Sequence, residues 1–99
     1  MKIYITRLGA EWCGPCRTMK PIFNEVKQEL ETNDLVFEEL GEDDKEMHVL
    51  AQRFEVKNIP HILITDDTKT TLYGRIIGTM SKEELKNKII NIVEESKNI

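Results

Sequence analysis

The sequence contains little cysteine, proline or tryptophan: its 99 residues include two cysteines, three prolines and one tryptophan. It also has no apolar run that approaches the ~20 residues of a membrane-spanning helix. Met1 and Lys2 lead directly into Ile3-Tyr4-Ile5, without the charged leader, apolar core and small-residue cleavage site of a secretion signal. These absences argue against a membrane span, and we expect a cytoplasmic location.

Basic residues do not outnumber acidic residues. The 14 Lys and Arg residues are set against 18 Asp and Glu residues, which gives a formal net charge of −4. This balance argues against a nonspecific electrostatic hold on nucleic acid and fits protein substrates better. With 39% hydrophobic and 32% charged residues, the composition is typical of a globular protein. We expect one domain over residues 1–99, and a monomer.

The two cysteines form a C-x-x-C motif, Trp12-Cys13-Gly14-Pro15-Cys16, where a short strand is expected to give way to a helix. Two thiols at this spacing can close a small disulfide ring, and the first is placed to react as a thiolate at the positive end of the helix. The same spacing also serves as half of a zinc site, which needs four ligands. His48 and His61 are isolated in the sequence, so dithiol chemistry is favoured and no metal site is expected.

Turn residues divide the chain into short alternating elements in the order βαβαββα. The first helix is indicated by apolar residues at three- and four-residue steps, with Pro21 inside it, and the last helix by the capping box Ser81-Lys82-Glu83-Glu84. The expected strands cover Lys2 to Leu8, Leu35 to Leu40, Ile59 to Thr65 and Thr71 to Ile77. The expected inward-facing helix residues are Cys16, Met19, Phe23, Val26 and Leu30, then Met47, Leu50, Ala51 and Phe54, and finally Leu85, Ile89, Ile92 and Val93.

Four segments together resemble the thioredoxin family. Residues 10–17 are similar to its active-site motif, Pro21 to its helix-kinking proline, Ile59-Pro60 to its cis-proline loop, and residues 78–85 to its glycine and last-helix entrance. The resemblance implies an α/β thioredoxin-like fold with a four-stranded mixed sheet flanked by helices. The sequence lacks the family's first strand and helix, as the smaller glutaredoxins do. The resemblance also implies that the strand after Pro60 runs antiparallel to its neighbours.

The resemblance further implies a thiol-disulfide oxidoreductase that reduces protein disulfides through Cys13 and Cys16, with Cys13 exposed and Cys16 covered. No bound cofactor is needed, because the cysteine pair itself carries the electrons, and a thioredoxin reductase or an equivalent reductant would reopen the ring. The residues expected to shape the substrate-binding surface are Trp12, Gly14, Pro15, Ile59 and Pro60. The alternatives are a glutathione-dependent, glutaredoxin-like reductant and a thioredoxin-shaped binding subunit.

Arg7, Glu39 and His61 depart from the family pattern. Arg7 stands six residues before Cys13, where thioredoxins usually place a buried aspartate, and Glu39 stands near the place of the accompanying lysine. We hypothesise a reversed ion pair between them, the alternative being that both side chains point to solvent. Arginine cannot act as a base, so Glu39 or water would take the Cys16 proton. His61 replaces the usual threonine, and a packed histidine is favoured over a catalytic one.

Two charged groups are expected to be ordinary surface features. An acidic run is interpreted as a solvated turn and helix cap rather than a metal site, and the lysines of the last helix as its solvent face. The acidic residues are Glu38, Glu39, Glu42, Asp43, Asp44 and Glu46, and the lysines are Lys82, Lys86, Lys88 and Lys97.

Overall fold

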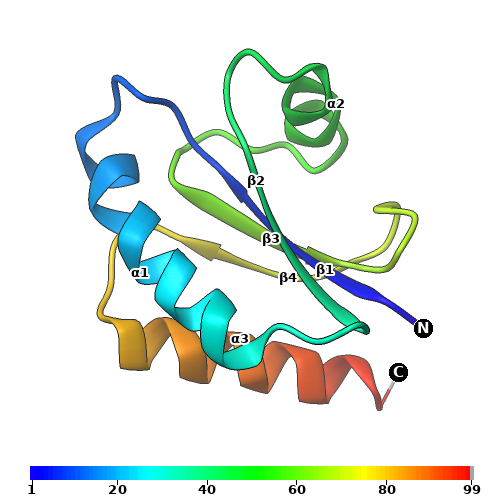
Figure 1. Cartoon of the computed structure of the whole chain (residues 1–99). Coiled ribbons are helices and arrows are strands. Elements are labelled where there is room, and N and C mark those ends of the chain that lie inside the picture. The colour runs from blue at the N-terminus through cyan, green and yellow to red at the C-terminus, as the bar shows by residue number, and fades with distance from the viewer. Residues whose placement is uncertain (99) are drawn as a thin grey trace.

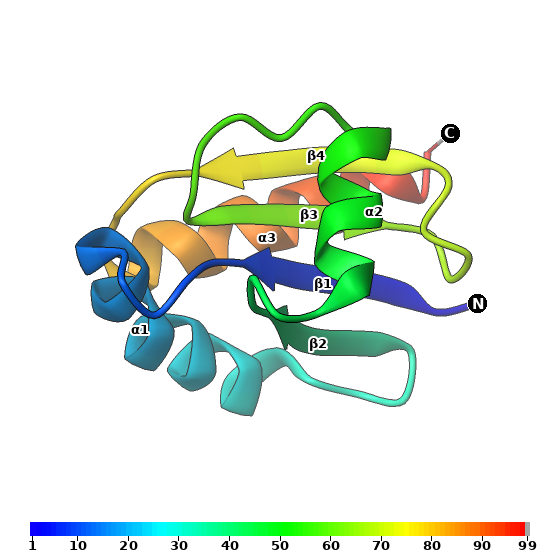
Figure 2. The same ribbon diagram turned by 90° about the horizontal axis from the view of Figure 1, so that it is seen from above.

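The computed structural model describes residues 1–98; Ile99, the last residue of the expected domain, lies outside them. Its elements confirm the order βαβαββα and form one sheet with α1 and α3 on one face and α2 on the other (Figure 1, Figure 2). The elements are β1 (Ile3–Leu8), α1 (Gly14–Leu30), β2 (Leu35–Leu40), α2 (Lys45–Arg53), β3 (His61–Thr65), β4 (Leu72–Ile77) and α3 (Lys82–Ser96).

The sheet has the strand order β2-β1-β3-β4 and is mixed. β1 and β2 are parallel and are connected by α1, whereas β3 is antiparallel to both β1 and β4, as expected for the strand after Pro60. Leu8, the last residue of β1, lies opposite His61, the first residue of β3. The segment that follows β1 and the segment that precedes β3 therefore meet at one end of the sheet, and these segments carry the cysteines and Ile59-Pro60.

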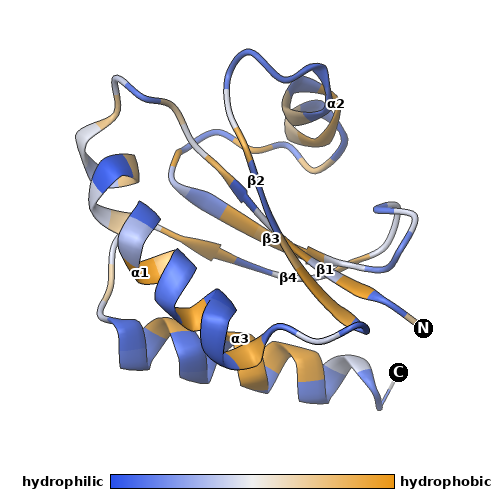
Figure 3. Ribbon diagram, in the orientation of Figure 1, coloured by the Kyte–Doolittle hydropathy of each residue, from blue (hydrophilic) through white to orange (hydrophobic). Residues whose placement is uncertain are grey.

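Apolar side chains pack in two clusters, one on each face of the sheet. The ribbon coloured by hydropathy shows hydrophobic residues of the helices on the sides that face the sheet (Figure 3). Met19, Phe23 and Val26 of α1 are buried as the helical spacing predicts, whereas Leu30 is only partly buried at the helix end. Full burial of one such side chain contributes roughly 1.5–3 kcal/mol to folding. The smaller cluster under α2 contains Leu8, Met47, Leu50, Phe54 and Leu63. The strand that leads to the cysteines is thus held from both sides.

The helix ends follow the sequence signals with one difference. Pro15 lies in the first turn of α1, and the Ser81 hydroxyl accepts the Glu84 amide at 3.2 Å to cap α3. Asp44 occupies the N-cap position of α2, but its carboxylate accepts the Gly41 amide at 2.7 Å instead of a helix amide. The acidic turn is therefore closed on itself, and the expected side-chain cap of α2 is not made.

The lysines expected on the solvent face of the last helix are exposed or partly exposed, and two of them also have carboxylate partners on α1. Lys82 and Lys86 both bind the carboxylate of Glu29 on α1, and Lys82 also lies 3.7 Å from Glu25. These ion pairs arise because α1 and α3 lie side by side on the same face of the sheet (Figure 1). Within residues 1–98, no helix is both long and apolar enough to span a membrane.

Candidate functional site

Cys13 and Cys16 form a disulfide at the start of α1, with their Cα atoms 5.2 Å apart. Cys13 is the N-cap residue of the helix and has extended backbone angles (φ −89°, ψ 112°). The Cys16 amide donates to the Cys13 sulfur at 3.2 Å, so this sulfur occupies the place that a hydroxyl or carboxylate oxygen usually takes at a helix start. The ring closure predicted from the spacing is confirmed, and the cap places one sulfur at the positive end of the helix.

The expectation that Cys13 is exposed was wrong in this oxidised state. Only 7% of Cys13 and 2% of Cys16 are exposed to solvent. Ala10 belongs to the same buried cluster as the pair, and Ile59 packs against this cluster. Both cysteines are buried, whereas their sequence neighbours Trp12, Gly14 and Pro15 are exposed.

The Ile59-Pro60 peptide bond is cis, as the resemblance implied. The Ile59 carbonyl oxygen lies 3.9 Å from the Cys13 sulfur, and the Pro60 carbonyl accepts the Gly78 amide at 3.1 Å. Ile59 is half-buried and Pro60 is buried. The structure therefore brings these two residues to the cysteines, and the loop that carries them is bonded to the residue that follows β4.

Trp12 is the most exposed aromatic side chain near the cysteines, with 69% of its surface accessible. Its indole nitrogen donates to the Glu42 carboxylate at 2.7 Å. The sequence did not indicate this partner, since the two residues are 30 positions apart and Glu42 is only one of several acids in its turn. This hydrogen bond orients the indole ring, although most of the ring is exposed to solvent.

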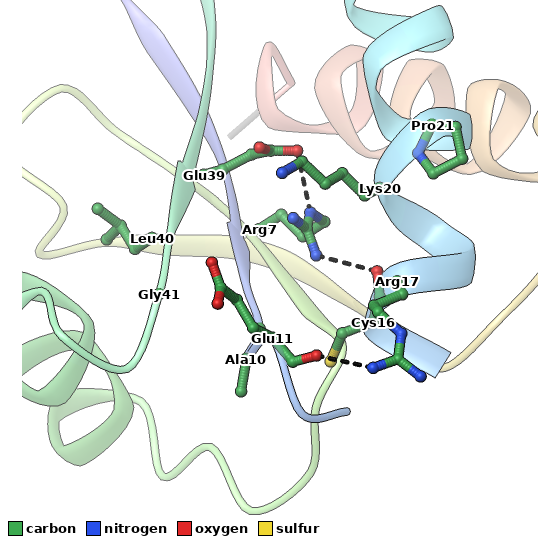
Figure 4. Close-up of a pocket in the computed structure, with 11 residues that line it drawn as sticks. Arg7, Ala10, Glu11, Cys16, Arg17, Lys20, Pro21, Glu39, Leu40 and Gly41 are labelled. Carbon is green, nitrogen blue, oxygen red and sulfur yellow. Dashed lines mark hydrogen bonds and ion pairs between the residues drawn. The ribbon is translucent and has the colours of Figure 1, made fainter. Parts of the chain in front are cut away.

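Arg7 and Glu39 form the reversed ion pair, which rules out the alternative that both side chains point to solvent. Arg7 Nε donates to Glu39 Oε1 at 3.2 Å, and Arg7 Nη1 donates to the Cys16 carbonyl oxygen at 3.4 Å. Only 7% of Arg7 is exposed, and its guanidinium lies 5.9 Å from the centre of the Phe23 ring. Figure 4 shows Arg7 between Glu39 of β2 and Cys16 of α1.

A cavity of about 660 Å³ lies beside this ion pair. Its wall includes Arg7, Cys16 and Glu39, together with Lys20 and Pro21 of α1 (Figure 4). Gly9 is part of the same wall, and a β-carbon added there would lie 2.8 Å from Arg7 Nη1. The missing side chain of Gly9 thus leaves the space in which the guanidinium sits next to Cys16.

His61 is packed as expected, with 1% of its surface exposed. Its Nδ1 lies 3.2 Å from the Asn58 carbonyl oxygen, and its Nε2 lies 3.4 Å from Arg75 Nη1. Burial lowers the pKa of His61, the bond to Asn58 opposes this change, and the charge of Arg75 adds to it. Arg75 also donates to the Phe54 carbonyl at 2.9 Å. The two side chains fasten both ends of the loop that carries Ile59.

The acidic run is not simply solvated, which corrects the expectation. Glu38 binds Lys69 and accepts the Thr6 hydroxyl at 3.0 Å, while Glu46 lies 3.1 Å from Lys69. Lys69 is only 8% exposed, and its ammonium lies 4.8 Å from the centre of the Tyr4 ring. Among residues 1–98, no group of three or more His, Cys, Asp or Glu side chains is arranged to hold a metal ion.

A disulfide at a helix N-terminus beside a cis-proline loop, carried by this mixed sheet, defines a dithiol-disulfide exchange protein. The family model described as Thioredoxin matches residues 2–91. The chain therefore belongs to the thioredoxin family.

Thioredoxins of distant organisms are similar to the chain. The thioredoxin of Mycoplasmoides gallisepticum is 34% identical over 78% of this chain and 71% of its own length, and that of Chlamydia pneumoniae is 34% identical over 81% and 72%. The crystal structure of thioredoxin NaTrxh from Nicotiana alata superposes with a TM-score of 0.71 at 30% identity, covering 91% of this chain and 72% of that one.

Family membership and the cysteine pair together make the protein a thiol-disulfide oxidoreductase that acts on protein disulfides. Its redox group is the Cys13–Cys16 pair itself, because thioredoxins need no cofactor. Disulfide-containing substrates and a reductant are therefore its general partners.

Proposed function

We propose that Cys13 is the attacking thiol and Cys16 the resolving thiol of a cytoplasmic, monomeric reductant of protein disulfides. The observation that carries this assignment is the Cys13 sulfur at the N-cap of α1, where it accepts the Cys16 amide at 3.2 Å. In the reduced protein the same amide and the helix dipole stabilise negative charge on this sulfur. The second sulfur lies one turn along the helix and is covered, so it meets a substrate only after Cys13 has bound it.

The exchange then runs in two steps. The Cys13 thiolate attacks one sulfur of the substrate disulfide, a bond forms between them, and the other substrate sulfur leaves as a thiolate. The Cys16 thiolate next attacks the Cys13 sulfur, which closes the ring and releases the remaining substrate sulfur as a second thiolate. Two electrons have passed from the cysteine pair to the substrate. A reductant outside the protein must supply two electrons to open the ring again.

Substrate docking is assigned to the surface around the ring. The Ile59 carbonyl beside Cys13 offers a backbone acceptor to an extended substrate segment, as in strand addition to a sheet edge. Trp12 adds a large apolar surface whose orientation is fixed by Glu42. Gly14 and Pro15 leave the approach to Cys13 open, since both are exposed, Gly14 has no side chain and Pro15 has only a small ring.

Two serine variants test the order of the cysteines. Cys16→Ser keeps the attacking thiol and removes the resolving thiol, so we expect it to accumulate a mixed disulfide with insulin that reducing agent dissolves. Cys13→Ser is the matched control, which differs only in the sulfur that remains, and we expect no adduct from it. Trapping by Cys13→Ser and not by Cys16→Ser would reverse the assignment.

The reductant is proposed to be a thioredoxin reductase, ultimately fed by a nicotinamide cofactor. We expect the oxidised protein to be reduced rapidly by thioredoxin reductase with NADPH and slowly by glutathione with its reductase. Faster reduction by glutathione would favour the glutaredoxin-like alternative. If the double variant Cys13→Ser, Cys16→Ser kept the full activity of a partner protein, this result would favour the alternative of a binding subunit. The double variant retains the surface but has no redox group.

A further inference from the structure

The ion pair behind Cys16 has its positive end directed at the cysteine. Arg7 Nη1 donates to the Cys16 carbonyl, whereas Glu39 binds to Nε of the guanidinium. Figure 4 shows Glu39 on the side of Arg7 away from Cys16. The guanidinium of Arg7 is closer to the Cys16 sulfur than the Glu39 carboxylate is, so the net electrostatic effect of the ion pair on this sulfur is positive.

The distance between the guanidinium and the sulfur is short enough to matter. The position of a β-carbon on Gly9 would lie 2.8 Å from Arg7 Nη1 and 3.4 Å from Cys16 Sγ, so these two atoms are at most 6.2 Å apart. An opposite charge within roughly 4–6 Å favours the ionised form of a titratable group. Arg7 is largely withdrawn from solvent, which keeps its field from being screened as a surface charge would be.

Arg7 cannot take a proton from Cys16, since a guanidinium remains protonated in proteins. We infer that Arg7 is a positioning residue that promotes ionisation of the Cys16 thiol by its fixed charge, so that the resolving step needs no carboxylate base. The Cys16 proton passes to solvent in the cavity of about 660 Å³ that Arg7 and Cys16 both line. The thiolate then attacks Cys13 as described above. This inference rests on the proposed order of the two cysteines.

Glu39 has a different part in this arrangement. Its carboxylate holds the guanidinium in place and is 29% exposed, so water reaches it from the cavity side. If Glu39 were the base for Cys16, neutralising it would slow resolution. If Arg7 acts by charge, neutralising Glu39 leaves resolution unchanged or makes it faster, because the cation is then less compensated.

The test follows the two thiols separately by stopped-flow spectroscopy. Reduced protein is mixed with dithiobis(nitrobenzoate), from which the attack of Cys13 releases one coloured thiolate and the attack of Cys16 on the mixed disulfide releases a second. For Arg7→Met we expect the second phase to slow about tenfold at pH 7 and its pH midpoint to rise by about one unit. The first phase should change by less than about threefold, because the Cys13 sulfur has its own helix amide.

Three variants separate charge from structure. Arg7→Lys keeps the cation and should resolve within about threefold of the parent rate. Glu39→Gln should resolve at least as fast as the parent. Lys69→Met is the matched control, since it removes another buried cation paired with glutamate on the opposite face of the sheet, and it should leave both phases unchanged.

Should Arg7→Met fail to fold, the double variant Arg7→Met, Glu39→Met removes both charges together and should show the same slow resolution. Parent-like resolution in Arg7→Met, or in the double variant Arg7→Met, Glu39→Met, overturns the inference, as does a tenfold slowing in Glu39→Gln alone. A parent protein that shows no first phase would instead contradict the proposed role of Cys13. A normal first phase with a second phase indifferent to Arg7 would contradict only the role of Arg7.

Discussion

Two buried cations pair with neighbouring glutamates of β2, but on opposite faces of the sheet. Arg7 on the α1 face binds Glu39 and the backbone of Cys16. Lys69 on the α2 face binds Glu38 and Glu46. The pairs differ in what surrounds them: the first borders a cavity and a redox sulfur, and the second joins a turn, a strand and a helix. The comparison teaches that a buried ion pair serves chemistry or architecture according to its neighbours, not its own composition.

The largest stability change is expected for Lys69→Met. The substitution leaves the partly buried carboxylate of Glu38 and the more exposed carboxylate of Glu46 without their shared cation, which costs about 2–4 kcal/mol of unfolding free energy. Urea unfolding measures the loss, and disulfide exchange by the folded variant should be unaffected. A loss below about 1 kcal/mol would show that water compensates this network and would remove the contrast with Arg7.

Arg7→Met should destabilise the fold less, by about 1–3 kcal/mol, because only one carboxylate loses its partner and that carboxylate borders the cavity. The same urea experiment on both variants ranks them directly. The comparison predicts that Lys69→Met lowers stability more than Arg7→Met does. For the rate of the resolving step, it predicts that Arg7→Met has the larger effect. If one variant were the more severe in both measurements, the division of roles would be wrong.

His61 is a buried polar side chain next to the loop that carries Ile59, and we expect it to affect the stability of the fold but not the reactivity of the cysteines. Burial lowers its pKa below the usual 6.5, so the unfolded chain binds a proton more readily than the folded protein does. The contribution of neutral His61 to the free energy of unfolding is complete above pH 6.5 and is lost as the pH falls through the pKa of the folded protein. The free energy of unfolding changes by at most about 1.4 kcal/mol per pH unit in this range. Urea midpoints from pH 7.5 down to pH 5 should show this fall in the parent.

His61→Thr removes that titrating group and should flatten the same pH series. The ionisation of Cys13, followed by alkylation rate against pH, should match the parent. A displaced alkylation curve would mean that His61 acts on the dithiol and not only on the loop that carries Ile59.

The smallest effect is expected at Glu29, whose two lysine partners bind it at the exposed junction of α1 and α3. Lys82 and then Lys86 lower the pKa of Glu29 from 4.5 to about 2, so its stabilisation is present above pH 4.5 and is lost as the pH falls to about 2. Glu29→Gln should lower the urea midpoint slightly at low salt and not measurably in 1 M NaCl. A decrease in the urea midpoint that persists in 1 M NaCl would show that the ion pairs of Glu29 are shielded from salt, as those of Arg7 and Lys69 are expected to be.

The strands were predictable where local pattern and position agree. Leu35–Leu40 is bounded as expected, and the helices start at the proline and serine signals of Pro15 and Ser81. The pairing of Arg7 with Glu39 was predictable from the resemblance to thioredoxins, and the two residues lie opposite each other on the parallel strands β1 and β2. Such features depend on neighbours in sequence or on a known strand pairing.

The remaining features depend on how distant segments meet. Cys13 is buried because Ala10, Cys16 and Ile59 pack around it, and Ile59 comes from a segment 46 positions away, which the motif alone does not reveal. Lys69 reaches Glu38 from a turn in which its own backbone adopts a left-handed conformation (φ 57°), uncommon for a residue with a side chain. The contact between Trp12 and Glu42 joins two loops that no periodicity connects.

Leu8 at the end of β1 lies opposite His61 at the start of β3. This strand pairing fixes the distance between the Cys13 sulfur, which follows β1, and the Ile59 carbonyl oxygen, which precedes β3. Adaptation during docking therefore falls to the other molecule. A pliable, stretched-out segment that carries a disulfide will react faster than the same disulfide clamped in a stiff loop, and the spread of rates among client proteins will report their pliability.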